Sequence, residues 1–382
     1  QCLALNHAAI YSLFRGDLRY FTSGNARKSA DLAVSLIDNL GSQTSHGDCG
    51  FSPKIGNALP VLLRAAWYYK DGEYQWIAEN YGNLEKFYAV HLGSVARDAP
   101  ICLSDVKPVR PKKFLGVKVM PLDPKVYDFT SYPRSRYPTK PNVPLEKSFD
   151  KLTFRSSFDP GGQYLLLDGY SRGHHLHFDG NSIIRFTDRD RIFLFDGDYI
   201  KTGVSQHNSV LVIRNGECPL LPPMCGLEHL ADLDETGFTK TYINEYNGVD
   251  WYRNIIWLKD KFFLIIDELK AREGGDYVFK CLWRSMGKTE LLNRTFKVEQ
   301  GGKEFYIKNV DGAKLRLRED KENGERYWSG YKHAEPVMKI LHEVRERSVK
   351  PKEDENFKNL LYTSEGKAKQ TFDATKLGPK QV

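Results

Sequence analysis

The second half of the chain is a succession of short segments rich in β-branched and aromatic residues, with no regular helix between them. From residue 150 onward, Gly, Asn and Asp separate these segments. This composition predicts strands. Because no helical segments alternate with them, a parallel α/β sheet is disfavoured and stacked antiparallel sheets are expected. The expected strands are 151–157, 163–171, 182–188, 191–198, 208–215, 250–259, 262–269, 277–285, 304–310, 313–319 and 357–366, with a Lys-rich loop at 345–357.

In the first hundred residues the apolar side chains recur with a helical period. Apolar residues recur at three- and four-residue spacing, which predicts paired antiparallel helices. An array of so few helix pairs needs further members to close its core, so we expect a piece of a larger helical domain, and the chain itself to be a processed or truncated product. The expected helices are 3–14, 26–40, 55–70 and 74–92.

Proline marks the change between the two halves. Nine of the 18 prolines fall between Pro100 and Pro144, a density that excludes helix interiors and central strands. The expected organisation is an α+β multidomain chain. It has a helical domain at 1–98, a Pro-rich linker at 99–149 and an antiparallel β-sandwich at 150–382.

Composition narrows the class of partner. The chain has 382 residues, 41% of them hydrophobic and 27% charged, which is typical of a globular protein. A net charge of +7 with 13% aromatic residues suits an acidic polymer, either nucleic acid or an anionic polysaccharide. Nucleic acid is disfavoured because there is no basic helix, zinc-finger spacing or RNP-type strand. No apolar run is as long as a membrane span. The oligomeric state is not indicated.

The cysteines do not define the fold. Six scattered cysteines, none in a C-x-x-C pair, do not make a disulfide scaffold. Cys218 and Cys225 either close a small loop or are free buried thiols.

The segment GHHLHFDGNS, residues 173–182, concentrates three histidines and an aspartate. In an extended chain His175, His177 and Asp179 share one face. Asp196 follows the aliphatic run of the expected strand 191–198, and His207 stands directly before the expected strand 208–215. Together His177, Asp196 and His207 make a ligand set for zinc or a similar divalent ion, with room for an oxygen ligand. The alternative is a hydrogen-bonded network without a metal.

The order H-x-H-x-D-x-x-S, then F-D-G-D-Y, then S-x-H-N-S-V resembles the β-sheet domain of heparinase II/III-like polysaccharide lyases. The resemblance is strongest over residues 150–270. It implies a partial α/α toroid of helix pairs followed by a stacked antiparallel β-sandwich. It also implies an anionic polysaccharide substrate and a periplasmic or secreted location, although the first residues lack a signal-peptide pattern.

The resemblance also implies roles for single residues. His177, Asp196 and His207 match metal-binding positions, for Zn²⁺ or a similar ion such as Mn²⁺ or Ca²⁺. His175 matches a histidine that faces the substrate and is the expected catalytic base or charge neutraliser. Asn208 matches a position that contacts substrate or orients the imidazoles.

Three other residues flank the motif. Arg155 matches a position that often carries Arg, where it pairs with a substrate carboxylate or with a local aspartate. Tyr170 and Tyr199 are candidates for proton transfer and substrate contact, and packing is the alternative for both. For Asp179 and Asp198, capping of turns and strand ends is the favoured role.

The expected activity is cleavage of a uronate-containing chain by β-elimination. Such lyases also use a tyrosine from the helical domain, and none stands in the obvious place near His46, Asp48 and Asn57. Tyr68 and Tyr69 lie nearby on a helix where core packing is expected. Two alternatives follow: a uronyl epimerase on the same scaffold, and a non-catalytic polysaccharide-binding protein with a structural metal.

Overall fold

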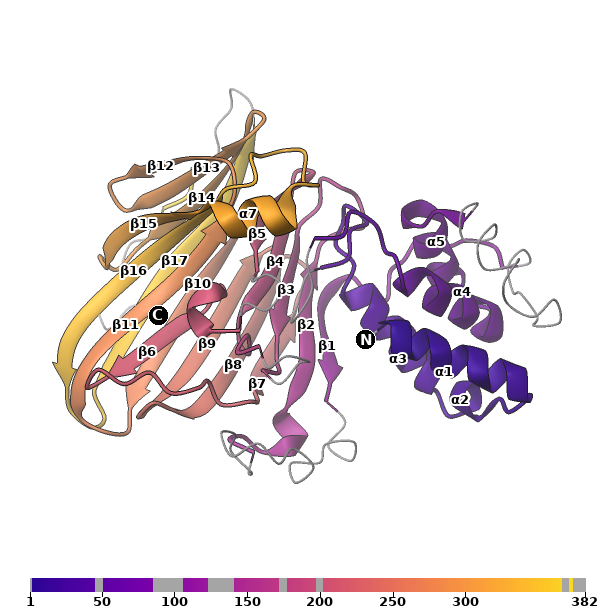
Figure 1. Cartoon of the computed structure of the whole chain (residues 1–382), viewed down its shortest axis with the longest axis horizontal. Coiled ribbons are helices and arrows are strands. Elements are labelled where there is room, and N and C mark those ends of the chain that lie inside the picture. Colours follow the sequence, from indigo (N-terminus) through magenta and orange to yellow (C-terminus); the bar gives the residue numbers. More distant parts are fainter. Residues whose placement is uncertain are drawn as a thin grey trace. The chain divides into compact units, whose positions relative to one another are not determined.

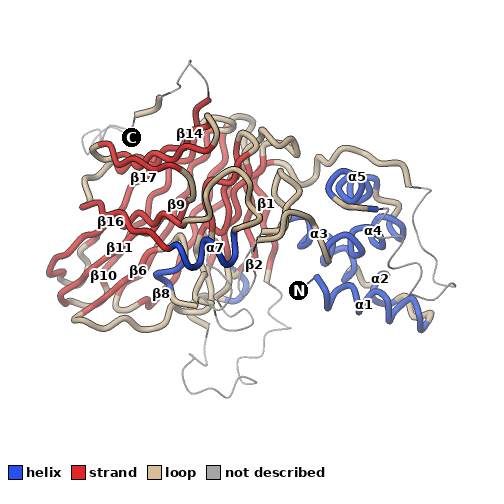
Figure 2. The backbone as a smooth tube through the Cα atoms, turned by 45° about the horizontal axis from the view of Figure 1, so that its top comes forward, coloured by secondary structure: helices blue, strands red, loops and turns tan. Residues whose placement is uncertain are grey.

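A computed structural model of the chain describes residues 2–44, 51–84, 106–122, 141–171, 177–196, 202–365 and 371–373. The chain forms two compact units. One takes in Gln1–Thr44 and Ser52–Leu115, and the other takes in Ser45–Phe51 and Gly116–Val382. Figure 1 labels the elements, and Figure 2 separates the helices from the strands by colour.

The first unit is helical. Four expected helices are found, although the end of the range 74–92 lies outside the described residues. Tyr68 and Tyr69 pack against the cluster around Phe21, and the Tyr69 hydroxyl donates to the Phe21 carbonyl oxygen at 2.7 Å. The helices are α1 Cys2–Arg15, α2 Arg19–Thr22, α3 Asn25–Ser35, α4 Ala58–Tyr69 and α5 Gly72–Tyr81. None of the helices in the described ranges is long and apolar enough to cross a membrane.

The second unit contains three antiparallel sheets (Figure 1). The five-stranded sheet has the order β1-β2-β3-β4-β5, and the four-stranded sheet has the order β15-β16-β11-β6. The eight-stranded sheet has the order β12-β13-β14-β17-β10-β9-β8-β7. The strands are β1 Gly116–Pro121, β2 Phe149–Arg155, β3 Tyr164–Asp168, β4 Ile183–Asp188, β5 Arg191–Phe195, β6 Val210–Arg214, β7 Gly226–Asp232, β8 Thr236–Tyr246, β9 Val249–Leu258, β10 Phe262–Ala271, β11 Gly275–Ser285, β12 Lys288–Leu292, β13 Thr295–Gln300, β14 Lys303–Asn309, β15 Lys314–Asp320, β16 Met338–Val349 and β17 Asp354–Glu365. Short helices lie between them, η2 Leu145–Lys147, η3 Val204–Gln206 and α7 Lys321–Trp328.

One hydrophobic core joins the three sheets. Strand β9 alternates buried and half-buried residues along its whole length, as a sheet with one covered face does. The aromatic ring of Phe154 on β2 packs edge-on against Trp257 on β9, and Phe193 on β5 stacks on Phe305 on β14. The same core cluster includes Trp283 on β11. The antiparallel sandwich expected from the sequence is therefore confirmed.

Several regions differ from the expectation. Strand β1 lies within the range expected to be linker, because GVKVMP pairs with β2 along its length. The range 345–357, expected to be a loop, begins inside β16. Its charged residues are accommodated in the strand because Arg345 pairs with Asp311 and Arg347 pairs with Glu353. Strands β7, β8, β12, β13 and β16 and helix α7 were not expected. In the described residues Cys218, Cys225 and Cys281 are free thiols.

Glu343 is one of the acids that the sandwich buries, and it lies between two sheets. Glu343 on β16 is 0% exposed and accepts hydrogen bonds from Trp283 Nε1 at 3.1 Å, Asn309 Nδ2 at 3.1 Å and Asn359 Nδ2 at 3.0 Å. Burial, with the nearby charge of Asp311, outweighs these bonds and raises the pKa of Glu343 to about 8.

This shift predicts a pH-dependent stability. Between about pH 4.5 and 8 the folded chain keeps on Glu343 a proton that the unfolded chain has lost. The free energy of unfolding should therefore fall as the pH rises through this window, by at most roughly 5 kcal/mol. Glu343→Gln should flatten the dependence, and Glu346→Gln on the exposed end of β16 should not. Urea denaturation across the window measures this, and equal slopes in all three proteins would contradict the assignment.

Candidate functional site

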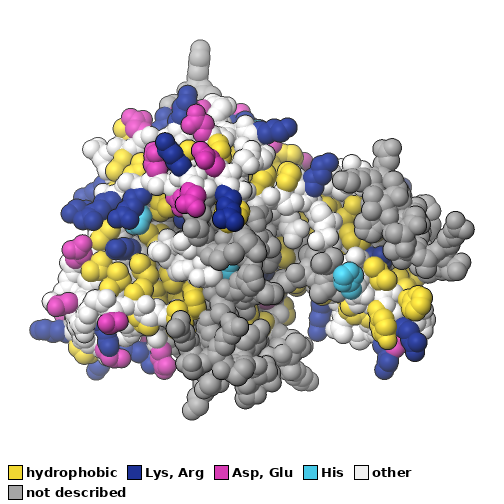
Figure 3. All heavy atoms as spheres, viewed as in Figure 1, with side chains coloured by type: hydrophobic (Ala, Val, Ile, Leu, Met, Phe, Trp, Pro, Cys, Tyr) yellow, Lys and Arg dark blue, Asp and Glu magenta, His cyan; other side chains and the backbone are white. Residues whose placement is uncertain are grey.

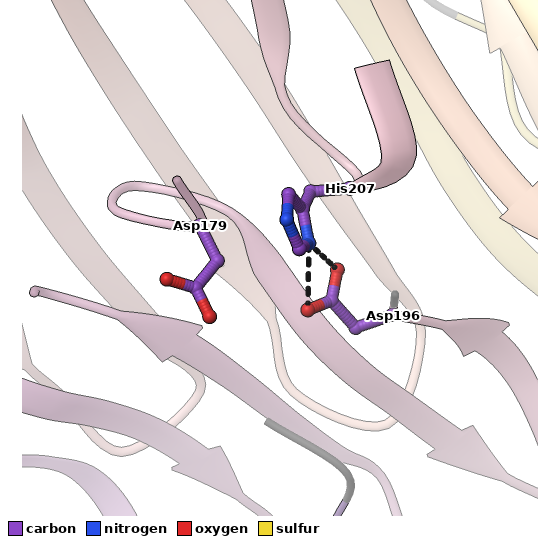
Figure 4. Close-up of side chains that lie close together, drawn as sticks. All are labelled: Asp179, Asp196 and His207. Carbon is purple, nitrogen blue, oxygen red and sulfur yellow. Dashed lines mark hydrogen bonds and ion pairs between the residues drawn. The ribbon is translucent and has the colours of Figure 1, made fainter. Parts of the chain in front are cut away.

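The polar residues of the histidine motif meet two other strand ends inside the sheet unit. Asp179 lies in the loop between β3 and β4, Asp196 follows β5, and His207 follows η3 just before β6. One potential ligand atom from each of the three lies within 4.8 Å of the others, and all three residues are buried (Figure 4). Residues far apart in sequence thus converge on one polar cluster.

Asp196 and His207 form the closest contact of this cluster. His207 Nδ1 lies 3.1 Å from both carboxylate oxygens of Asp196. His207 Nε2 is buried and has no hydrogen-bond partner among the described residues. The ring of His177, also buried, has its centroid 5.8 Å from that of His207. Of the predicted ligands, Asp196 and His207 belong to the compact set, which Asp179 completes, and His177 lies beside His207.

Burial and charge oppose each other at these groups. Burial disfavours a charged His207, but the negative charge and hydrogen bond of Asp196, with the charge of Asp179, raise the pKa of His207 overall. Burial also raises the pKa of Asp179; the histidines oppose this increase, and the charge of Asp196 adds to it. Two buried carboxylates beside two imidazoles can hold a proton or a cation.

Asn208 fixes the strand that follows His207. Its Nδ2 donates to the carbonyl oxygens of Ile183 and Phe195, both at 2.8 Å, and its Oδ1 accepts from the backbone N–H of Arg284 at 2.6 Å. The side chain is 0% exposed. These bonds tie β4, β5 and β11 together next to the cluster, and they favour the positioning role of Asn208 over direct substrate contact.

A buried ion pair on β9 and β10 binds the two segments that carry Asp179 and His207. Arg253 on β9 forms a bidentate pair with Asp267 on β10, from Nε at 2.7 Å and Nη2 at 3.1 Å. Its remaining Nη1 donates to the carbonyl oxygens of Asn181 at 2.6 Å and Asn208 at 3.2 Å. Asn181 is two residues from Asp179, and Asn208 is next to His207. The pair thus links the eight-stranded sheet to both segments.

The histidine-motif loop is also fixed at its other end. The backbone N–H of Gly180 donates to Ser171 Oγ at 2.7 Å, and a Cβ at Gly180 would lie 2.3 Å from that oxygen. Asn181 has a φ of 60°, a left-handed conformation that Asn tolerates better than most residues. Lys151 bridges Asp150 and Asp168 beneath the loop.

Two predicted residues lie in other surroundings. Arg155 is 1% exposed, and its guanidinium carbon lies 4.3 Å from the ring centroids of both Phe158 and Tyr164. Tyr170 is half-buried and packs against the cluster of Val143, Met224 and Tyr242. His175, Tyr199, Asp198, His46 and Asp48 lie outside the described residues.

The sequence interpretation gave Asp179 a capping role and did not consider Arg253 or Asp267. The signal for Asp179 was present, because the motif puts it on the same face as His177. Arg253 is in phase with Trp251 and Ile255 on β9, which are buried. A charged residue at a position whose neighbours on the same face are core residues indicates a buried pair.

Comparisons with known proteins agree with this fold. The chain matches no protein-family model, and no curated protein matches it. Among solved structures, it superposes on heparan sulfate lyase HepC from Pedobacter heparinus with a TM-score of 0.60 and 13% identity, covering 88% of this chain and 46% of that one. A heparinase III structure gives a TM-score of 0.60 and 9% identity, covering 91% of this chain and 49% of that one.

The chain therefore has a heparinase-like fold. Its antiparallel sheets correspond to the β-sandwich part of those proteins. It spans about half the length of the structures it matches.

The Arg253–Asp267 pair predicts a large cost on removal of one partner. Arg253→Gln leaves a buried carboxylate without its cation and should lower the free energy of unfolding by about 3–5 kcal/mol. Arg272→Gln is the matched control: Arg272 donates to Asp250 at 2.7 Å but is 45% exposed, so the loss should be about 1 kcal/mol or less. Urea denaturation of the three proteins gives both values.

The double variant Arg253→Met/Asp267→Leu separates stability from positioning. It removes both charges and should recover much of the lost stability. If Arg253→Gln were as stable as Arg272→Gln, the Arg253–Asp267 pair would not have the structural role given to it here.

Proposed function

We propose that the protein is a polysaccharide lyase that cleaves a uronate-containing anionic polysaccharide by β-elimination. The observation that carries the proposal is the buried convergence of Asp179, Asp196 and His207 on a heparinase-like fold. The net charge of +7 suits an anionic polymer. The proposal extends to a helical unit that is part of an α/α toroid and to a periplasmic or secreted location.

The reaction requires three kinds of group. A base removes the proton on the carbon next to the uronate carboxylate, the bond to the glycosidic oxygen breaks as a carbon–carbon double bond forms, and that oxygen takes up a proton. The carboxylate must be neutralised so that the enolate-like charge can develop. In our proposal His175 is the base or the neutralising group, and Tyr199 contacts the substrate.

The remaining predicted residues have smaller parts. Arg155 lies between aromatic rings and Tyr170 lies in a packing cluster, so a direct part in the reaction would need the substrate to reach them. Asn208 supports the site by holding His207 and Arg284 in register.

The donor set fits a divalent cation. Two carboxylates and the imidazole of His207 share a buried site, and the ring of His177 lies beside it. The buried Nε2 of His207 has no partner among the described residues. Such groups are costly to bury unless they are paired or bind a metal. We propose that His177, Asp196 and His207 hold Zn²⁺, or a similar ion such as Mn²⁺ or Ca²⁺, with Asp179 as a further ligand. When bound, the ion would hold the loops of the site in place and neutralise the two carboxylates.

Zinc content tests the metal assignment. The purified chain, dialysed against Zn²⁺ and then against metal-free buffer, should retain about one ion. His207→Ala and Asp179→Asn should each reduce this to background, while His229→Ala, on the exposed strand β7, should leave it unchanged. Zinc affinity should fall as the pH is lowered, because the ligands must be deprotonated. Full retention in His207→Ala would contradict the assignment.

Ultraviolet absorbance of the unsaturated sugar tests the activity. The whole chain is incubated with alginate, heparan sulfate, chondroitin, hyaluronan and ulvan, and absorbance should rise with at least one of them. The rise should be lost in His175→Ala and kept in His229→Ala.

Other outcomes assign the alternatives. Exchange of the uronate proton with solvent, without absorbance, would indicate an epimerase. Binding with neither exchange nor absorbance would indicate a polysaccharide-binding protein.

A further inference from the structure

The four-stranded sheet has one face turned into the core and one turned away from it. On β11 the core side chains are Phe279, Cys281 and Trp283. Side chains alternate along a strand, so Lys280, Leu282 and Arg284 lie on the other face. We name this the basic face, and it comprises Lys280, Leu282, Arg284, Lys314, Arg316, Arg318, Ile340, His342 and Val344.

The strand register places these residues in rows across the sheet. Lys314 pairs with Val344, which pairs with Lys280. Arg316 pairs with His342, which pairs with Leu282, and Arg318 pairs with Ile340, which pairs with Arg284. Along β15 the three cations are therefore spaced about 6.8 Å apart. Figure 3 looks onto this side of the unit and shows basic side chains gathered over β15 with hydrophobic ones beside them.

The basic face carries four cations whose charge is not neutralised by an ion pair among the described residues. Lys280, Lys314, Arg316 and Arg318 form no ion pair within the described part of the chain. The opposite side of the same strands differs, because Lys339 pairs with Glu319 and Arg345 pairs with Asp311. Three of these cations follow one another along β15 and Lys280 lies two strands away on β11, so the face concentrates positive charge that an anionic ligand would neutralise.

The pKa of His342 is affected by the same concentration of positive charge. It is half-buried, and its burial together with the charges of Arg318, Lys280, Arg284 and Arg316 lowers its pKa to about 4. At neutral pH it is therefore an uncharged imidazole among cations, able to donate or accept a hydrogen bond.

The basic face leads to the candidate site. Arg284 is 1% exposed and lies in the same row of the sheet as Ile340 and Arg318. The backbone N–H of Arg284 is also bonded to Asn208, beside His207. One residue therefore connects the rows of cations with the buried cluster.

We infer that the basic face is an extended binding surface for an anionic polysaccharide, outside the reacting centre, along which the chain continues toward the site at His207. The identity of the ligand rests on the proposed function. The exposed cations Lys314, Arg316 and Arg318 contact carboxylates or sulfates, and the apolar stems of these three side chains contact the sugar rings. A long chain reaches both surfaces, and a short oligosaccharide is held at the site alone.

The experiment compares two variants of the full chain that each lose two charges. Arg316→Gln/Arg318→Gln changes the basic face, and Lys261→Gln/Lys288→Gln removes two exposed lysines elsewhere in the sheet unit. Fluorescence anisotropy measures binding of labelled long heparan sulfate chains and of a tetrasaccharide prepared from them. The arginine variant should bind the long chains between about twofold and thirtyfold more weakly than the lysine variant does, and the difference should shrink at high salt. Both variants should bind the tetrasaccharide equally.

The outcomes separate this inference from the proposed function. Equal binding of the long chains by both variants would overturn the inference, whether or not the chain is a lyase. Weaker binding by the arginine variant, with no unsaturated product from any polysaccharide, would support the basic face and reject the lyase. If single-stranded DNA of matched charge, or anionic vesicles, bind more tightly than heparan sulfate and depend on the same arginines, the assignment to a polysaccharide is wrong.

Discussion

The buried pair of Arg253 and Asp267 is the interaction on which the candidate site depends. Both side chains are fully buried, and Trp251 Nε1 donates a further hydrogen bond to Asp267 at 2.8 Å. Replacing such a pair by apolar residues is often neutral or stabilising, by about 1–4 kcal/mol, so stability alone does not explain it. Its explanation lies in Nη1 of Arg253, which reaches the backbone of Asn181 and of Asn208. A leucine pair could fill the space but could not hold those two carbonyl groups.

The sheets supply the rest of the positioning. Asn208 ties β4, β5 and β11 together at the ends that carry the cluster, and Arg284 connects the cluster with the basic face. The cluster of Asp179, Asp196 and His207 is thus held by hydrogen bonds from both the eight-stranded and the four-stranded sheet. This layered support suits a site whose charged groups must stay apart from water until a cation or substrate arrives.

The sequence predicted the strand-rich half because alternation and β-branched residues are local signals. The ligand set of His177, Asp196 and His207 came from the resemblance, because spacing along the chain does not show that three residues converge. It did not predict β7, whose residues are mostly exposed, or β16, in which Lys339 pairs with Glu319 of β15 and Arg345 pairs with Asp311 of a turn. Arg253 and the basic face were also missed. Arg253 had a local signal, because it shares a face of β9 with the buried Trp251 and Ile255. The basic face depends on which strands are neighbours, since Arg316 meets His342 only because β15 pairs with β16. The residue type at one position does not show which distant strand will pair with it.

The central claim is that the buried cluster is a divalent-metal centre held in place by the sandwich. Anomalous X-ray scattering at the zinc edge, from crystals grown with Zn²⁺, tests it most directly. The account predicts a peak about 2.0–2.2 Å from ligand atoms of His207 and Asp196, within the space bounded by His177 and Asp179. A cluster without a peak, in crystals whose zinc lies at exposed histidines, would contradict it and leave a hydrogen-bonded network in its place.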